Sequence, residues 1–155
     1  MEFGNTEIKT VESALHGMAK AYSDYAKAFG LSYMALVMLE RISWHPDGVT
    51  QKVLCEETFY NKQSVNSIIN AFYKEKYISF SEMDSDRRQK LIKFTDLGHA
   101  FAEKVLGDLR KLELECAEHL PEDEAKKLMA TVNMFKNEIN EKINTYLACV
   151  KAGNI

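Results

Sequence analysis

Proline, cysteine and tryptophan are scarce in this 155-residue chain, which contains two, three and one of them, respectively. Because proline interrupts helical hydrogen bonding, its scarcity favours long helices. Cys55, Cys116 and Cys149 are scattered, odd in number and without the spacing of metal ligands. We therefore expect buried free thiols in a reducing compartment, and no disulfide framework.

Long apolar runs are absent as well. No segment approaches the roughly 20 apolar residues that a membrane-spanning helix needs. The N-terminal residues lack the basic and then apolar pattern of a secretion signal. These absences predict a cytoplasmic protein that does not act on membranes. Hydrophobic residues make up 46% of the chain and charged residues 28%, which fits one soluble, helix-rich domain or a small domain with long helical extensions.

An overall positive charge is also absent, since the formal net charge is −3. The distribution is uneven, however. Residues 61–93 carry seven basic and four acidic residues, a balance of +3, so the remainder of the chain carries −6. Phosphate attraction is screened within roughly 10 Å at ordinary salt, so a local basic surface can bind nucleic acid on an acidic protein. The excess is modest, and we expect dimerisation to double it.

Helical periodicity and capping residues divide the first half of the chain. An apolar seam with spacings of three and four covers residues 8–29, which predicts a long first helix. Ser32, Thr50 and Asn61 are each positioned to cap the helix that follows. The helices expected after these caps are one that ends before Pro46, one over 51–57 and one over 62–76.

Two alternating strands and two long helices follow. Residues 77–81 and 90–94 are predicted to form the strands of a hairpin, and Thr95 can cap a fifth helix. A sixth helix begins at Pro121, a position where the missing N–H of proline costs nothing.

Basic residues occupy the expected tip of this hairpin. Arg87 and Arg88 lie between acidic residues at a turn. A helix-turn-helix over residues 50–77 followed by such a hairpin is the plan of a winged DNA-binding domain. One helix enters the major groove while the hairpin reaches the minor groove or the backbone. Each arginine could instead be a solvated turn residue.

The helix expected over residues 62–76 has an unusual polar face. Val65, Ile68, Ile69 and Phe72 form its apolar stripe. The other side carries amide and hydroxyl side chains in place of the Glu and Lys that favour helix, and such side chains suit base edges and phosphates. The residues predicted to contact DNA in this region are Thr50, Lys62, Gln63, Ser64, Asn66, Ser67 and Asn70. An ordinary polar helix surface is the alternative.

The long terminal helices carry apolar seams that a compact module of residues 31–98 would leave exposed. A second copy of the chain could cover them. We therefore predict a homodimer through residues 1–30 and 99–155, with residues 31–98 as the DNA-binding region. A two-fold dimer presents two recognition helices, as a pseudo-palindromic operator in double-stranded DNA requires.

With these features the chain resembles the MarR family of bacterial transcription regulators over nearly its whole length. The sharpest element is the acidic and doubly basic tip at 86–88, followed by a short strand, Thr95 and Gly98. The resemblance implies that Arg88 enters the minor groove and that Asp86 braces it.

The resemblance also implies roles for the helices. Residues 62–76 map to the recognition helix, in which Ser67 stands where the family often has an arginine, so the base preference stays open. The family's effector crevice lies between the first two helices and the winged module, where aromatic residues suit a small lipophilic or phenolic ligand. The candidate pocket residues are Met18, Tyr22, Tyr25, Met38 and Trp44. Core packing is the alternative for the same residues.

Metal and redox sensing have weak support in the sequence. The histidines are unpaired at helical spacing and have no cysteine at ligand spacing, whereas a zinc site needs three or four convergent ligands. Cys55 is followed by two glutamates, which disfavour a reactive thiolate. The family's peroxide sensors use a cysteine in the first helix, and this first helix has none. No cofactor is expected, and a metal- or redox-responsive regulator of the same fold stays an alternative.

The sequence therefore predicts a mostly helical protein with a winged helix-turn-helix, a small β-hairpin wing and long terminal dimerisation helices. Its expected function is that of a dimeric, sequence-specific transcription regulator, a repressor relieved by a small-molecule effector. No nucleophile–base pair, phosphate loop or carboxylate dyad is visible, so we expect no enzyme. The alternative of another class is a winged-helix module that binds protein and not DNA.

Overall fold

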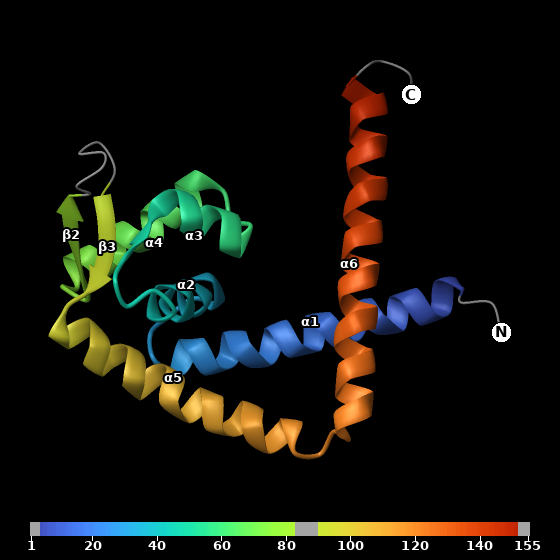
Figure 1. Ribbon diagram of the computed structural model, residues 1–155, viewed down its shortest axis with the longest axis horizontal. Coiled ribbons are helices and arrows are strands. Elements are labelled where there is room, and N and C mark those ends of the chain that lie inside the picture. Colours follow the sequence, from blue (N-terminus) through green and yellow to red (C-terminus); the bar gives the residue numbers. More distant parts are fainter. Residues whose placement is uncertain (1–3, 83–89, 152–155) are drawn as a thin grey trace. The chain divides into compact units, whose positions relative to one another are not determined.

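The computed structural model describes residues 4–82 and 90–151, which form helices and one small sheet (Figure 1). The elements in chain order are α1 (Asn5–Ala28), α2 (Tyr33–Ser43), β1 (Val49–Thr50), α3 (Gln51–Thr58), α4 (Lys62–Lys74), β2 (Ile78–Glu82), β3 (Lys90–Phe94), α5 (Asp96–Ala117) and α6 (Glu122–Lys151).

Capping side chains start the helices where the sequence indicates. The backbone N–H of Ala35 donates to Ser32 Oγ (3.1 Å), and that of Val53 donates to Thr50 Oγ1 (3.3 Å). Asn61 Oδ1 accepts from the N–H of Ser64 (2.9 Å), which fixes the start of α4. Each cap satisfies an N–H that has no partner within its own helix.

Two helices end in the same type of turn. Gly30, with φ +73, follows α1, and the N–H of Leu31 bonds back to the carbonyl of Ala26. After α4, Lys76 adopts φ 59 and the N–H of Tyr77 bonds to the carbonyl of Phe72. This turn ends α4 at Lys74, two residues before the predicted end of the helix.

The sheet is antiparallel with the strand order β1-β3-β2. In the hairpin, Ile78 pairs with Phe94 and Glu82 pairs with Lys90. The two-residue strand β1 pairs Val49 with Ile92 and was not predicted, because two residues carry no periodicity. Together, α3, α4 and this hairpin confirm the predicted winged helix-turn-helix fold.

The core forms around α2, which contacts α1, α3, α4 and β3. Met38, Leu39 and Ile42 on α2 are almost completely buried. Apolar residues of the other elements meet them, and those with the least exposure are Leu54, Val65, Ile78, Ile92, Val105 and Leu106. Burial of such side chains contributes roughly 1.5–3 kcal/mol each and holds α4 in place.

Thr95 and Gly98 join the hairpin to α5. Thr95 Oγ1 donates to the carbonyl of Lys76 (2.7 Å) and accepts from the N–H of Gly98 (3.0 Å). A Cβ on Gly98 would lie 1.8 Å from the carbonyl oxygen of Tyr77, so only glycine allows this close approach.

The chain forms two compact units, Met1–Asp108 and Leu109–Ile155. No residue of α6, which is described throughout, is buried, although its apolar residues recur at helical spacing. Among the helices of the described residues, none is both long enough and apolar enough to span a membrane. The predicted division into residues 31–98 for DNA binding and residues 1–30 and 99–155 for dimerisation stays a prediction.

The three cysteines are free, as predicted, but the prediction that they are buried is wrong. Cys116 is exposed, and Cys55 and Cys149 are partly exposed. Cys116 and Cys149 lie on α5 and α6, in the unit Leu109–Ile155, where many apolar side chains are exposed. Cys55 lies on the open side of α3.

Candidate nucleic-acid interface

Helix α4 is divided into a buried side and an exposed polar side. Val65, Ile69 and Phe72 are at most 3% exposed, which anchors the helix in the core. Ile68, predicted to be buried with them, is only partly so. The polar side chains remain accessible: Lys62, Gln63, Asn66, Ser67 and Asn70 are exposed, and Ser64 is partly exposed.

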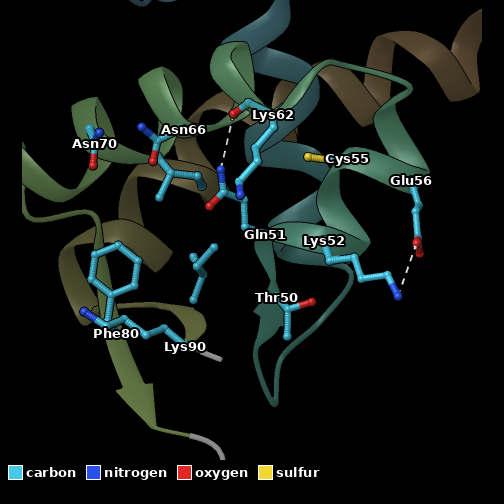
Figure 2. A pocket seen from close by; sticks show the side chains of 12 residues that line it. Thr50, Gln51, Lys52, Cys55, Glu56, Lys62, Asn66, Asn70, Phe80 and Lys90 are labelled. Carbon is cyan, nitrogen blue, oxygen red and sulfur yellow. Dashed lines mark hydrogen bonds and ion pairs between the residues drawn. The ribbon is translucent and has the colours of Figure 1, made fainter. Parts of the chain in front are cut away.

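A groove of about 860 Å³ opens between α3, α4 and the strands β2 and β3; we call it the α4 groove. Thr50, Lys62, Asn66 and Asn70 line it, so these four predicted DNA-contacting residues are brought together. Figure 2 shows Asn70, Asn66 and Lys62 in a row along α4. The other three predicted residues of this region, Gln63, Ser64 and Ser67, do not line the groove.

The opposite walls of the α4 groove contain residues that the sequence did not single out. Lys52 and Gln51 come from α3, and Phe80 and Lys90 from the hairpin (Figure 2). Gln51 Nε2 donates to the carbonyl of Lys62 (3.3 Å), which ties α3 to the start of α4. Lys90 Nζ lies 5.6 Å from the centre of the Phe80 ring. Successive side chains of a strand point to opposite faces of the sheet, and this alternation could have predicted that Phe80 and Lys90 lie on the same face of the hairpin.

The charge in the α4 groove is mainly positive. Three lysines line the groove, Lys52, Lys62 and Lys90. Glu56 is the single carboxylate among its described lining residues. Lys52 Nζ lies 3.9 Å from Glu56 Oε1, and both side chains are mostly exposed, so this pair is weak. Ammonium groups along the walls and amide groups on α4 suit phosphates and base edges, respectively.

A histidine–glutamate contact, a left-handed residue and a tyrosine characterise the turn between α3 and α4 and the segments beside it. His45 Nε2 lies 3.0 Å from Glu57 Oε1, which links the end of α2 to α3. Phe59 ends α3 with φ 58, and its side chain is 84% exposed. Burial raises the pKa of the Tyr60 hydroxyl, and the nearby Tyr33 raises it further, while Arg41 lowers it. Tyr60 therefore stays neutral at physiological pH and adds no negative charge to the turn.

The wing tip and the effector residues stay predictions. Asp86, Arg87 and Arg88 lie outside the described residues. Of the predicted effector residues, Met38 is completely buried, whereas Met18 and Trp44 are 58% and 54% exposed.

The other two effector candidates are both partly exposed, and each has a defined neighbour. Tyr25 donates its hydroxyl to the carbonyl of Val105 (2.7 Å), and the Tyr22 ring lies 6.3 Å from that of Tyr33. In the described part of the chain, His, Cys, Asp and Glu side chains do not gather in groups of three that could hold a metal ion.

A recognition-type helix with an open polar face, followed by an antiparallel hairpin, defines a winged helix-turn-helix protein. The family model described as "MarR family" matches residues 29–89. The resemblance to the MarR family is thus confirmed over this segment, and the chain has the fold of MarR-family transcription regulators.

Solved structures of regulators are similar along most of the chain. The MepR–DNA complex of S. aureus is 19% identical, with a TM-score of 0.70 over 89% of this chain and 99% of that chain. A MarR family regulator from Neisseria meningitidis is 17% identical, with a TM-score of 0.77 over 89% and 96% of the two chains. AbsC, a MarR family transcriptional regulator from Streptomyces coelicolor, is 16% identical, with a TM-score of 0.74 over 91% and 99%. Among curated proteins, the sequence has no match.

Proposed function

We propose that the chain acts as a homodimer that binds a pseudo-palindromic operator in double-stranded DNA and represses transcription from it. The observation that carries this proposal is the polar face of α4. Lys62, Asn66 and Asn70 recur at intervals of one helical turn and line an open, mainly basic groove. A helix of this kind, anchored by a buried opposite side, is suited to the major groove.

The dimer is supported by the apolar stripe of α6, which we define as Leu128, Val132, Phe135, Ile139, Ile143, Tyr146 and Val150. Each of these side chains is between 38% and 56% exposed in the single chain. A contiguous apolar surface of this length favours association with a second copy. Two-fold symmetry would then present two α4 helices to successive major grooves, about 10 base pairs apart or a multiple of that spacing.

Selection of DNA from a random pool by the purified full-length protein tests this function. We expect an inverted repeat whose half-sites have the spacing given above. Selected sequences without an inverted repeat would contradict the symmetric dimer. Failure to select any DNA at low salt, with a folded dimer confirmed in the same sample, would favour the protein-interaction alternative.

Substitutions on α4 should separate base reading from phosphate binding. Asn66→Ala or Gln63→Ala should change the preferred base at one position of each half-site, since amide side chains can bond base edges. Lys62→Ala should weaken all sequences alike and reduce the salt dependence by about one phosphate contact per protomer. The control is Lys20→Ala, which removes an exposed lysine of α1. The DNA selection is repeated with each variant. An unchanged DNA motif after both amide substitutions would contradict the prediction that these side chains read bases.

A separate prediction concerns the role of the wing in DNA binding, which rests on the family resemblance. Arg88→Ala should weaken operator binding by about 1–3 kcal/mol, or roughly fivefold to 150-fold, at unchanged helix content. Asp86→Ala should have a smaller effect, because it would act only through the orientation of Arg88. Binding is measured by fluorescence anisotropy at matched salt. Parent-like affinity of the Arg88→Ala protein would remove the wing from the interface.

Relief of repression by a small molecule completes the proposed function. A ligand can weaken DNA binding only by preferring an arrangement of the helices that differs from the DNA-bound one. The predicted pocket residues Met18, Tyr22, Tyr25, Met38 and Trp44 are one candidate site for it.

A further inference from the structure

Strand β2 carries one accessible apolar side chain among polar ones. Its first residue, Ile78, is buried, and the four that follow are exposed: Ser79, Phe80, Ser81 and Glu82. Because side chains alternate along a strand, Phe80 lies on the same face as Ile78, the face that packs on the core. The Phe80 ring nevertheless stays 37% exposed, so it lies at the open edge of this face.

The Phe80 ring forms part of the hairpin wall of the α4 groove, across from Asn66 and Asn70 (Figure 2). It is the only aromatic side chain among the described residues that line this groove. Ile69 and Ile92 also line it, but they are at most 3% exposed. Phe80 therefore keeps more apolar surface accessible than either isoleucine.

Neighbouring side chains hold the Phe80 ring in place. Tyr73 of α4 packs against it with ring centroids 5.0 Å apart and an interplanar angle of 41°, and Tyr73 itself does not line the groove. Across the hairpin, Phe80 pairs with the buried Ile92. Lys90 Nζ lies 5.6 Å from the centre of the ring. The wall thus offers a preformed apolar surface next to a positive charge.

The part of a duplex that meets this wall follows from the proposed function, on which this inference rests. With α4 in the major groove and the hairpin directed towards the adjacent minor groove, one sugar–phosphate backbone separates the two elements. That backbone then runs along the hairpin wall of the α4 groove. The ammonium group of Lys90 suits its phosphates, and the apolar ring of Phe80 suits the carbon atoms of a sugar.

We propose that Phe80 packs against a deoxyribose of the operator and makes binding at that position selective for DNA over RNA. Deoxyribose has only hydrogen atoms on its 2′ carbon, whereas ribose carries a hydroxyl there, the group by which proteins distinguish RNA from DNA. Against the phenyl ring this hydroxyl would lose its water without gaining a hydrogen bond, which disfavours ribose. The lysines cannot supply this selectivity, because the phosphates of DNA and RNA are the same.

The test places a single ribonucleotide at each position of the selected operator in turn, and then a 2′-fluoro nucleotide at the same position. The two sugars favour the same ring pucker, so the comparison isolates the hydroxyl. Binding of the full-length protein is measured by fluorescence anisotropy at matched salt. At one position of each half-site, or at two adjacent ones, we expect the ribonucleotide duplex to bind about tenfold more weakly than the 2′-fluoro duplex. Equal affinities at every position overturn the assignment.

Two substitutions of Phe80 connect the selectivity to its side chain. Phe80→Ser should remove the difference between the two duplexes, because the serine hydroxyl can bond the 2′-hydroxyl. Phe80→Leu should keep the difference, because leucine preserves an apolar surface. Phe59→Ser is the matched control, since it removes a phenyl ring that is 84% exposed and does not line the α4 groove. Circular dichroism checks that each variant is folded.

The ratio of the two affinities separates the possible outcomes, because a general loss of DNA affinity does not change it. A purely structural role of Phe80 would lower both affinities and leave the ratio as in the parent, and this result in a folded Phe80→Ser protein overturns the inference. Loss of the ratio in Phe59→Ser would also overturn it. DNA binding without a hydroxyl penalty would refute this inference alone, whereas the absence of any DNA binding would refute the proposed function and this inference with it.

Discussion

Replacing Ile139 by aspartate should convert the protein from a dimer to a monomer and weaken operator binding at least a hundredfold. Ile139 lies at the centre of the α6 stripe and is 41% exposed in the single chain. In a dimer that buries this stripe, the new carboxylate would lose its water without gaining a partner, at a cost of several kcal/mol. In the dimer, two linked α4 helices bind the two half-sites simultaneously, which increases the affinity for DNA. Loss of the dimer also removes this gain in affinity.

Sedimentation measures the first effect and anisotropy on a selected operator measures the second. The parent should sediment at about twice 17.7 kDa and the variant at 17.7 kDa. Asn137→Asp is the matched control, since it adds the same charge on the opposite side of α6. An Ile139→Asp protein that remains a dimer would exclude the stripe from the interface, and a monomeric parent would remove the basis for a palindromic operator.

Replacing Gly98 by alanine should destabilise the protein by about 3 kcal/mol, because the new methyl group meets backbone that cannot move aside. The added Cβ would lie 1.8 Å from Tyr77 O and 2.7 Å from Tyr77 C. The same carbonyl accepts the N–H of Thr95 (3.0 Å), which holds it in place. The base of the hairpin and the start of α5 would have to separate, so the wing would lose its support.

Thermal unfolding followed by circular dichroism should show a melting temperature lower by roughly 10 °C. Gly17→Ala provides the control: nothing lies within 4 Å of a Cβ at Gly17, which is within α1. Alanine there should stabilise the helix by up to about 1 kcal/mol. Equal melting temperatures for Gly98→Ala and the parent would contradict the close approach between α5 and Tyr77.

The secondary structure and its order were predictable because their causes are local. Ser32, Thr50 and Asn61 cap helices through bonds to the third residue that follows, and such bonds need only a short stretch of chain. The apolar spacing of α4 likewise fixed which of its sides would be buried, and Val65, Ile69 and Phe72 are buried as predicted. Among the longer elements, deviations were confined to the ends, as at Lys76, whose left-handed backbone nothing in the sequence indicated.

The functional surfaces depended on contacts between distant segments. Lys90 and Lys52 share a groove with Asn66 because β3 pairs with β1, which leads into α3. Neither a two-residue strand nor its pairing with a distant strand produces a periodic pattern in the sequence. Met38 and Trp44 looked alike as candidate pocket residues, yet one is completely buried and the other 54% exposed, since the neighbours of α2 differ along its length.

The sequence by itself determined the winged helix-turn-helix fold, the polar face of α4 and the apolar stripe of α6, because hydrogen bonding and helical periodicity act over a few residues. Only the tertiary structure decided that Lys52, Lys62 and Lys90 line one groove together with Asn66 and Asn70 of α4. The physical reason is that a cavity is formed by side chains that packing brings together from separate elements. Its shape and charge therefore follow from long-range contacts that no local pattern encodes.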